Sequence, residues 1–539
     1  MNLPSHRAVS PWWAPAALVA LASLTPAQSP ALINNLYDNY REPDVAYDAT
    51  TDTYLVVWES SWEFWQREVS GGSTFIRDVY EIRGQFVDST GNPVGTSFLV
   101  TDFKVDGFRP RVANLNKTDR FLVTWEEASN NGDIYARTID AATGVLSARV
   151  PVANTVAAEV QPVVAGEAST LDDDAVVVWL NQSQGVILAC EVTAAAPGVV
   201  PAVGPPTAVT AGKVRHPAVA ASGDLAGRLL VAWTQDDGPR GEIFGRFIDR
   251  SAQRLTLPFP IYEGTDAAWP AVAGDGTSWV VAFQHREGGI LNFDIAAQVV
   301  RYDPVSASEY LFGGTQPVAA APNHNETRPA VAWIGESVKV GWKEDFAQGS
   351  QIHAKTIDPH TCIRCEPEFV VDTGTDAAWP AIASEMTAEL GSKSNGALHV
   401  FVQDDAVYGD LFHARDGLVT DVGGACGQGG TPDATCVVAP NAAFRFRVLH
   451  SHASQSAFMI LSGARLDAAL PPSCTLVPDP LLGVILGSGT SAQGNAALLV
   501  PIPDNPALIG ARLFAQWGVT GGSGSLGLDF SNALRVRIG

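Results

Sequence analysis

The chain is poor in positive charge. Its 539 residues contain 34 Lys and Arg against 57 Asp and Glu, which gives a formal net charge of −23. Because phosphate binding draws on clustered Lys and Arg, this balance argues against nucleic acid or an anionic membrane surface as the main partner. The chain also lacks a Gly-x-Ser-x-Gly elbow, a His-Glu-x-x-His zinc helix, a P-loop and a dinucleotide fingerprint. The familiar hydrolase and nucleotide-binding classes therefore have no support.

Long hydrophobic runs are also missing. No segment reaches the roughly 20 apolar residues that a membrane-spanning helix needs. Near the start, Arg7 precedes a short apolar core from Ala14 to Leu24, and small residues suited to cleavage follow at Ala27 to Ser29. This order is typical of a signal peptide, which we place at residues 1–29. We expect export to the cell surface or the medium; an uncleaved membrane anchor is the alternative.

Cysteine is scarce, but its even number is informative. An even count in an exported protein favours disulfides. The pair Cys362 and Cys365 could close locally, and Cys426 could pair with Cys436 or Cys474, which leaves the assignment of Cys190 open. The neighbouring histidines of the Cys-x-x-Cys segment suggest zinc as a weaker alternative. We predict no metal there.

Gly (50) and Pro (35) are abundant, and they punctuate an internal repeat. An X-Pro-x-Val-Ala segment, a Leu-Val-Val-Trp segment and an Ile-x-Gly/Ala segment recur in this order seven times. The repeat prolines are Pro43, Pro110, Pro162, Pro217, Pro270, Pro329 and Pro380. The matching aromatic residues are Trp58, Trp125, Trp179, Trp233, Phe283, Trp342 and Phe401.

Each unit is predicted to form a four-stranded sheet, because its apolar runs are short, rich in Val, Ile and aromatics, and bounded by turn residues. Four strands repeated seven times indicate a seven-bladed β-propeller. The segment Ala31 to Asn34 stands in the register of an outer strand and is expected to complete the seventh blade. The predicted fold is all-β, with a propeller over 30–420 and a C-terminal β-sandwich over 421–539.

The repeat resembles the Tyr-Leu-Val-Val-Trp type repeats of large extracellular bacterial proteins over about residues 30 to 420. This resemblance implies the fold and export, and it implies no particular activity. From Gly424 onward the chain resembles a C-terminal domain found in many secreted proteins of environmental bacteria. That second resemblance implies a role in attachment, stability or sorting.

The residues before the seven prolines are expected to share one rim of the propeller. They repeat in position and differ in chemistry: Glu42, Arg109, Gln161, His216, Trp269, Arg328 and Trp379. An insertion in the first repeat adds Trp62, Phe64 and Trp65 to the same face. We predict that Trp62, Trp65, Gln161, Trp269 and Trp379 bind a ligand, with the aromatic rings stacking on sugars. The alternative for Trp269 and Trp379 is packing between blades.

Acidic residues follow the aromatic strand in several repeats. They are Glu59, Glu126, Asp236, Glu344 and Asp404. One acid per repeat, without an Asp-x-Asp-x-Asp-Gly loop, favours hydrogen bonds to nearby backbone N–H groups over calcium binding. We predict no cofactor, with structural calcium as the alternative.

Two catalytic hypotheses follow from the same rim. His216 could act as a general base, with His285 as a second proton carrier and Arg109, Arg328 or Lys343 neutralising a uronate carboxylate. This equipment suits β-elimination and resembles the His and Arg logic of propeller polysaccharide lyases. A hydrolase would instead use carboxylates such as Glu42, Glu344 and Asp404.

The sequence favours a secreted propeller whose rim binds an extracellular ligand, most plausibly a polysaccharide. The first alternative is a polysaccharide-degrading enzyme, with a lyase favoured over a glycoside hydrolase. The second is a structural protein of the envelope or matrix. The fold alone does not choose among them, because propellers host many functions.

Overall fold

The fold was analysed in a computed structural model of the chain. It describes residues 30–537 except for gaps at 36–37, 68–73, 129–130, 167–173, 195, 222–226, 237–240, 265, 275–277, 287–291, 304–305, 307, 322, 335–336, 359–362, 365–368, 372–375, 385–396, 412–417, 422–430, 436–442, 450, 471–473, 493, 502–510 and 522–526. The regular elements of the described residues are all β-strands, as predicted. None of these residues forms a helix with the length and apolar character to cross a membrane.

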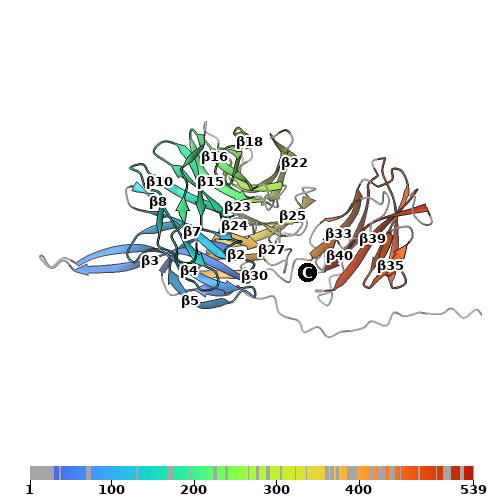
Figure 1. The fold of residues 1–539 in the computed structure, drawn as a ribbon, viewed down its shortest axis with the longest axis horizontal. Coiled ribbons are helices and arrows are strands. Elements are labelled where there is room, and N and C mark those ends of the chain that lie inside the picture. Colours follow the sequence, from blue (N-terminus) through green and yellow to red (C-terminus); the bar gives the residue numbers. More distant parts are fainter. Residues whose placement is uncertain are drawn as a thin grey trace, which may run out of the picture.

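Seven antiparallel sheets occupy the first three quarters of the chain (Figure 1). Blade one contains β2 (Asp38–Asp48), β3 (Thr53–Arg67), β4 (Thr74–Asp88) and β5 (Pro93–Leu99). Blade two contains β6 (Gly107–Leu115), β7 (Arg120–Glu127), β8 (Asp133–Asp140) and β9 (Val150–Ala153). Blade three contains β10 (Glu159–Gly166), β11 (Asp174–Asn181), β12 (Val186–Thr193), β13 (Ala202–Val203) and β14 (Thr207–Ala211). Blade four contains β15 (Val214–Ala221), β16 (Arg228–Gln235), β17 (Glu242–Asp249) and β18 (Phe259–Tyr262).

The remaining three sheets follow the same order. Blade five contains β19 (Ala268–Gly274), β20 (Ser278–His285), β21 (Asp294–Asp303) and β22 (Ser308–Ala319). Blade six contains β23 (Asn325–Ile334), β24 (Ser337–Phe346), β25 (Gly349–Asp358), β26 (Ile363–Arg364) and β27 (Phe369–Val370). Blade seven contains β28 (Ala378–Ser384), β29 (Ala397–Gln403), β30 (Ala406–Leu411) and the N-terminal β1 (Ala31–Asn34).

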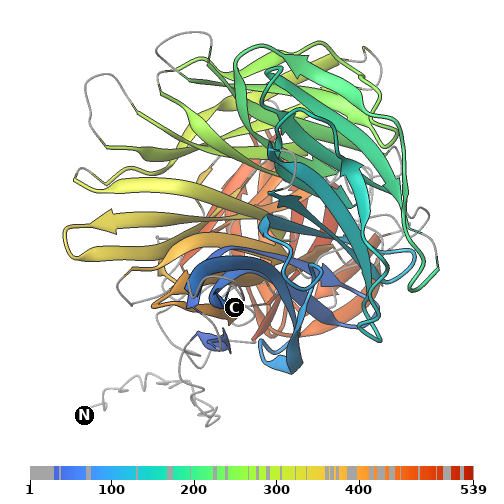
Figure 2. The same ribbon diagram turned by 90° about the vertical axis from the view of Figure 1, so that its left-hand side faces the viewer.

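The sheets close into a ring. The first strands of successive blades, β2, β6, β10, β15, β19, β23 and β28, each contact the next, and β28 contacts β2. The N-terminal β1 pairs with β30, so one sheet contains both the first strand and the last three strands of the ring. Figure 2 shows the blades following one another around the ring in chain order. This is the geometry of a β-propeller, in which each blade covers the faces of its neighbours.

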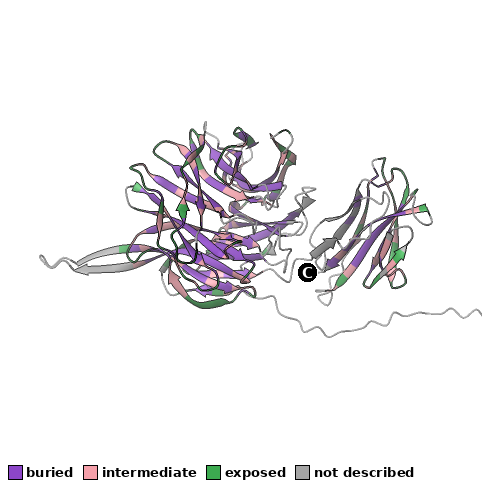
Figure 3. Ribbon diagram, in the orientation of Figure 1, coloured by how far each residue is buried: buried purple, intermediate pink, exposed green. Residues whose placement is uncertain are grey.

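The core lies between the blades. The repeat aromatic residues Trp58, Trp125, Trp233, Phe283 and Phe401 have no exposed surface, and the corresponding Trp179 and Trp342 are equally buried. Figure 3 shows buried residues along the strands of every blade. Because both faces of a blade pack against other blades, the second strands are continuous apolar runs rather than alternating ones. In the third strand of blade four, a Cβ at Gly245 would come within 2.7 Å of Ile261. The glycine of the Ile-x-Gly segment therefore gives the outer strand room to pack.

Blade one carries a long extension. Strands β3 and β4 remain paired from Thr53 opposite Asp88 to Arg67 opposite Thr74. Figure 1 shows this hairpin projecting from the ring. The insertion of the first repeat is therefore a continuation of the blade's second and third strands.

The C-terminal residues form three further sheets. The largest has the order β31 (Leu418–Asp421), β40 (Leu528–Arg537), β39 (Arg512–Thr520), β34 (Ser456–Ser462) and β37 (Gly483–Gly489). The others are β32 (Thr431–Thr435), β33 (Ala443–Leu449) and β38 (Ala496–Pro501), and the pair β35 (Arg465–Leu470) and β36 (Cys474–Pro478). One core joins the two larger sheets, with Phe446 from one and Trp517 from the other. The β-sandwich stays a prediction.

Cys190 is a free, buried thiol, and burial raises its pKa to about 12. It packs in the core between blades two and three and takes no part in a disulfide. Cys362, Cys365, Cys426 and Cys436 lie outside the described residues, as do residues 1–29, and the side chain of Cys474 is not described either. The disulfide and signal-peptide predictions therefore stay predictions.

Candidate functional site

The residue before each repeat proline has a left-handed backbone. The φ angles of Glu42, Arg109, Gln161, His216, Trp269, Arg328 and Trp379 lie between 43° and 60°. The pairing of the first and second strands shifts register at this point in all seven blades. Proline has no N–H to offer a ladder, so a bulge is where a paired strand tolerates it. A left-handed residue costs about 1–3 kcal/mol, which makes its repetition at one position notable.

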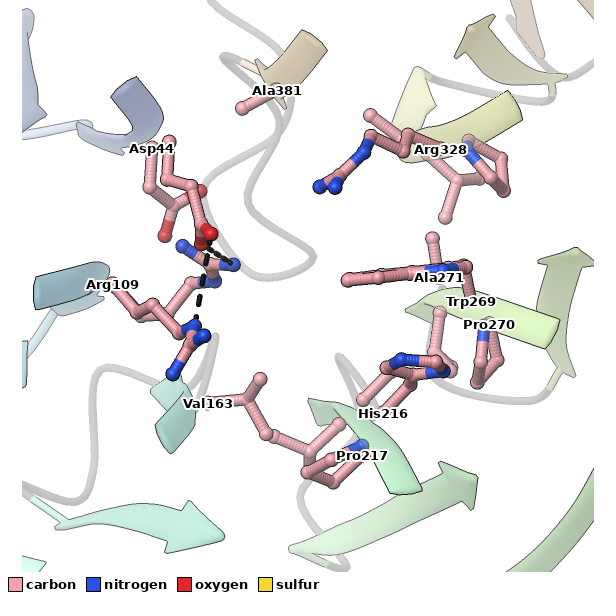
Figure 4. A pocket seen from close by; sticks show the side chains of 18 of the residues that line it. Asp44, Arg109, Val163, His216, Pro217, Trp269, Pro270, Ala271, Arg328 and Ala381 are labelled. Atoms are coloured by element: carbon pink, nitrogen blue, oxygen red, sulfur yellow. Dashed lines mark hydrogen bonds and ion pairs between the residues drawn. The ribbon is translucent and has the colours of Figure 1, made fainter. Parts of the chain in front are cut away.

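All seven pre-proline residues line one cavity of about 350 Å³ at the centre of the ring. The next inward-facing position of each first strand also lines it, beginning with Asp44, Arg111 and Val163. In blades four to seven this position is alanine. Figure 4 shows the side chains of this cavity converging from several blades. The cavity is within the size range of small-ligand sites.

Backbone N–H groups of the left-handed residues donate hydrogen bonds to side chains of the preceding blade. The carboxylates of Glu59 and Glu126 accept from the backbone N–H of Arg109 (3.4 Å) and Gln161 (3.2 Å) respectively. Gln284 accepts from Arg328 N–H at 3.1 Å. Each acceptor directly follows the repeat aromatic residue of the preceding blade. The acids predicted to serve backbone N–H groups do so at these two positions, and the bond links neighbouring blades.

Blade three lacks that acceptor, because the residue after Trp179 is Leu180. The side chain of Gln161 takes its place and accepts from His216 N–H at 3.0 Å. Gln161 was predicted to bind ligand. In the structure its amide oxygen already holds the neighbouring bulge.

One side of the cavity mouth is an ion-pair network, which we call the charged arc: Glu42, Arg109, Arg111 and Glu126. Arg109 lies 2.8 Å from Glu126 and 3.7 Å from Glu42, and Arg111 lies 3.2 Å from Glu42. Burial opposes the charge of Arg109, but the two glutamates outweigh it and raise its pKa. Behind the arc, burial and the nearby Glu42 raise the pKa of Glu59 to about 7. The cations of this arc are neutralised by the protein itself.

The other side of the mouth is a column of stacked side chains, which we call the stacked arc: His216, Trp269, Arg328 and Trp379. The His216 and Trp269 rings are 3.8 Å apart and nearly parallel. The guanidinium of Arg328 lies 4.4 Å from the Trp269 ring and 3.7 Å from the Trp379 ring. Figure 4 shows Trp269 between His216 and Arg328. Stacking of Trp269 on a sugar was predicted, but its two faces are covered by these neighbours.

The environment of His216 determines its protonation. Burial, together with the charges of Arg215, Arg328 and Arg109, lowers its pKa to about 3. The imidazole is therefore neutral at pH 7 and is a weak base there. Its Nδ1 lies 3.4 Å from the hydroxyl of Thr234.

The other predicted catalytic residues lie elsewhere. His285 does not line the cavity; its Nδ1 lies 3.1 Å from the Tyr262 hydroxyl and its ring packs against Phe283. Lys343 forms an ion pair with Asp345 at 2.8 Å and is also absent from the cavity wall. The structure therefore does not bring these two residues together with His216, Arg109 and Arg328 in the wall of this cavity.

The remaining predicted positions are on or near the extension of blade one. Trp62 stacks on Phe103, with ring centroids 6.2 Å apart and planes 16° apart. Trp65 lies in β3, and its side chain is outside the described part of the structure, as is that of Phe64. Phe103 and Arg111 were missed from the sequence. The period-two alternation of the first strand after Arg109 could have identified Arg111.

In blades four, six and seven, the acidic residues near the end of the second strand interact with side chains of their own blade. Asp236 pairs with Arg215 at 2.7 Å, and Asp404 accepts a long hydrogen bond from Gln403. Glu344 lies between the imidazoles of His324 (2.6 Å) and His353 (3.2 Å). Within the described residues, no group of three or more His, Cys, Asp or Glu side chains is arranged to hold a metal ion.

Neither a protein-family model nor a curated protein matches the chain. Among solved structures, it is similar to a hydrazine synthase chain of Kuenenia stuttgartiensis, at 10% identity over 70% of this chain and 97% of that one, with a TM-score of 0.41. A sialidase of Trypanosoma rangeli in complex with the inhibitor DANA shares 11% identity over 89% and 95% of the two chains, with a TM-score of 0.36. A thermostable family-43 glycoside hydrolase shares 10% identity over 53% and 99%, with a TM-score of 0.31. Likenesses of this strength identify no relative, and the propeller assignment rests on the strand pairing of this chain.

Proposed function

We propose that the central cavity binds an anionic group, a carboxylate or a sulfate, of an extracellular acidic polysaccharide. The observation that carries this proposal is the state of Arg328. Within the described residues, no carboxylate lies within ion-pairing distance of its guanidinium, and no side chain or carbonyl accepts a hydrogen bond from it. Its contacts are the two tryptophan rings and, through its backbone N–H, Gln284.

The stacking prepares this guanidinium for a ligand. The guanidinium lies over the rings of both Trp269 and Trp379, and Figure 4 shows Arg328 directed into the cavity. A planar guanidinium presents its N–H donors in a fork that matches a carboxylate or sulfate. Burial lowers the pKa of Arg328, but an arginine stays charged in proteins. An incoming anion would therefore meet a partly buried cation packed against two aromatic rings.

Binding is favoured over catalysis by the chemistry of His216. Proton abstraction beside a carboxylate needs a base whose pKa lies near the working pH. A pKa of about 3 makes the imidazole a poor acceptor, and His285 packs against Tyr262 outside the cavity. The neutral His216 ring instead supports Trp269 from below, which keeps the stacked arc in place.

The test is to measure affinity for polygalacturonate, dextran sulfate and neutral dextran at one fixed, near-physiological ionic strength. Fixed salt matters because a chain with a charge of −23 repels polyanions at long range. We expect binding of the two acidic polymers and none of dextran. Arg328→Asn tolerates the left-handed backbone and removes the charge, so affinity should fall roughly 10- to 100-fold. Arg328→Lys keeps the charge but loses the forked N–H donors, so its affinity should lie between those of the parent and Arg328→Asn.

A matched control removes another stacked arginine. Arg301 lies over the Phe312 ring at 3.6 Å, outside the cavity, so Arg301→Gln should leave affinity unchanged. Equal binding of dextran, or an Arg328→Asn variant that binds acidic polymers as well as the parent, would refute the proposal. The same mixtures are assayed for reducing ends and unsaturated uronate. Unsaturated ends that disappear in His216→Asn would replace the binding function with a lyase.

A further inference from the structure

We infer that Phe103, Trp62 and Lys104 form a second subsite, which binds further sugar units of the chain whose acidic group Arg328 holds. This inference rests on the proposed function and adds that the ligand is a polymer contacted internally at two places. The two subsites use different chemistry, since the cavity offers a guanidinium and the second site offers an aromatic surface.

The second subsite presents a largely exposed aromatic side chain. Phe103 is 66% exposed, although it stacks on Trp62 from the extension of blade one. The ammonium group of Lys104 lies 5.2 Å from the centre of the Phe103 ring. An aromatic ring can pack against the apolar C–H face of a sugar, and a cation beside it suits an acidic sugar. Phe103 differs from the tryptophans of the stacked arc in its exposure, since Trp269 and Trp379 are only partly exposed.

The loop that presents Phe103 is fixed at both ends of its turn. Val105 N–H donates to the carbonyl of Asp102 at 3.1 Å, and Lys104 adopts a left-handed backbone with φ of 66°. The carboxylate of Asp102 pairs with Arg137 at 3.0 Å and with Arg149 at 2.9 Å. These contacts restrain the backbone of the loop, so a ligand does not have to order it.

The position of the turn connects it to the cavity. It lies between β5 and β6, immediately before the strand that carries Arg109. Strand β3 passes Glu59, which serves the bulge of Arg109, before it reaches Trp62. Phe103 precedes Arg109 by six residues, which limits the distance between their Cα atoms to about 20 Å. Arg109 and Arg328 line the same cavity, so a ligand that reaches both Phe103 and Arg328 must pass the charged arc and must be an oligosaccharide of several units.

The experiment compares a uronate disaccharide with a long oligouronate by calorimetric titration. Phe103→Ala should lower the affinity for the long oligouronate by roughly 3- to 10-fold and leave the affinity for the disaccharide unchanged. Arg328→Asn should weaken both ligands. The control is Leu257→Ala, because Leu257 is 78% exposed on the loop between β17 and β18 and does not touch either subsite. Thermal melting of each variant confirms that it is folded.

The two proposals fail in different ways. If Phe103→Ala leaves the long oligouronate unaffected, or weakens both ligands equally, the second subsite is refuted while the role of Arg328 stands. If Arg328→Asn changes neither ligand, the proposed function fails and this inference fails with it. A loss with Leu257→Ala as large as that with Phe103→Ala would also refute the second subsite, because the effect would not be local.

Discussion

The charged arc and the stacked arc are built on the same backbone and do opposite things with charge. In both, a left-handed residue precedes proline in a bulged first strand and turns its side chain toward the cavity. In the charged arc, Arg109 and Arg111 are paired with Glu42 and Glu126. In the stacked arc, Arg328 is held between tryptophan rings without a carboxylate partner in the described structure. The repeated backbone therefore fixes where each side chain enters the cavity. The identity of the neighbouring side chains decides whether an arginine is paired within the protein or can bind a ligand.

The arcs also respond to pH with opposite signs. One titratable group with a large pKa shift belongs to each side of the cavity: the half-buried His216 in the stacked arc and the buried Glu59 behind the charged arc. The shift lowers the pKa of a base in one case and raises the pKa of an acid in the other. Both shifts favour the neutral form, as burial does generally. Substituting each group in turn, and measuring the unfolding free energy against pH, shows the contribution of each side of the cavity separately.

The largest expected effect is at His216. Its folded-state pKa is about 3, so between pH 6.5 and 3 the unfolded chain binds a proton that the folded chain does not. Stability is therefore fully present above pH 6.5 and falls by up to about 5 kcal/mol as the pH approaches 3. His216→Asn, which tolerates the left-handed backbone, should remove this loss. About 3 kcal/mol of this loss falls between pH 8 and pH 4, where urea denaturation of both proteins measures it.

The test is how the difference in unfolding free energy between the parent and His216→Asn changes with pH. Its absolute size is not informative, because Asn also loses the stacking on Trp269 at every pH. A difference between parent and variant that stays constant from pH 8 to pH 4 would show that His216 titrates normally. It would then also be available as a base, and the argument against a lyase would weaken.

The second effect is at Glu59, in the opposite direction. Its pKa is raised to about 7, so the unfolded carboxyl loses its proton above pH 4.5 while the folded one keeps it. The contribution to stability is present below pH 4.5 and lost as the pH rises through 7, a change of about 3 kcal/mol. Glu59→Gln keeps an oxygen that can accept from Arg109 N–H. Relative to the parent, it should gain that amount between pH 4 and pH 8.

The measurement is the same denaturation series, with Glu81→Gln as the control. Glu81 is equally buried on β4 of the same blade, but its carboxylate lies 3.5 Å from Arg83. Glu59→Gln should shift the curve toward alkaline stability, and the control should not. The unfolding free energies of the parent and of Glu59→Gln could instead change with pH in the same way. Glu59 would then be ionised over the whole range, and the charged arc would tolerate one more negative charge than we infer.

The ring of cavity residues could be predicted from the sequence because the repeat fixes register. Once Pro43 and its equivalents are aligned, the pre-proline residues must share one end of the first strands, whatever their chemistry. The same rule explains why His285 lies outside the cavity wall. It stands two residues after Phe283, so by the period of two it points to the same side as Phe283, where Tyr262 lies. The position one residue after the aromatic is the one that reaches the next bulge.

The pairing of side chains across blades could not be predicted in this way. Whether Arg109 or Arg328 meets a carboxylate depends on the residues of both adjacent blades and on the few ångströms between them. The tryptophans of the two Ala-Ala-Trp-Pro-Ala segments look equivalent in sequence. In the structure Trp269 has His216 on one side, whereas Trp379 packs against the core between blades seven and one. These neighbours are far away in the chain, about 50 residues between Trp269 and His216 and more than 300 between Trp379 and the core residues of blade one.

The smallest expected effect tests how the two arcs are joined. Gln161 connects them, because its N–H donates to Glu126 of the charged arc and its amide oxygen accepts from His216 of the stacked arc. Gln161→Ala leaves the His216 N–H without that acceptor and should cost about 1–2 kcal/mol of unfolding free energy. Gln161→Glu keeps an acceptor and should cost less. As a control, Gln316→Ala at a half-buried glutamine outside the ring of bulges should change stability by less than about 0.5 kcal/mol.

A second substitution shows whether the lost acceptor is the cause. Leu180 occupies the position from which Glu59, Glu126 and Gln284 serve the next bulge in other blades. Leu180→Gln alone should destabilise, because it replaces a buried apolar side chain. Combined with Gln161→Ala, it should return an acceptor to His216 N–H, so the double variant should be more stable than the sum of the single losses. Strict additivity in this cycle would mean that the bulge of His216 is held by packing on Trp269 rather than by its hydrogen bond.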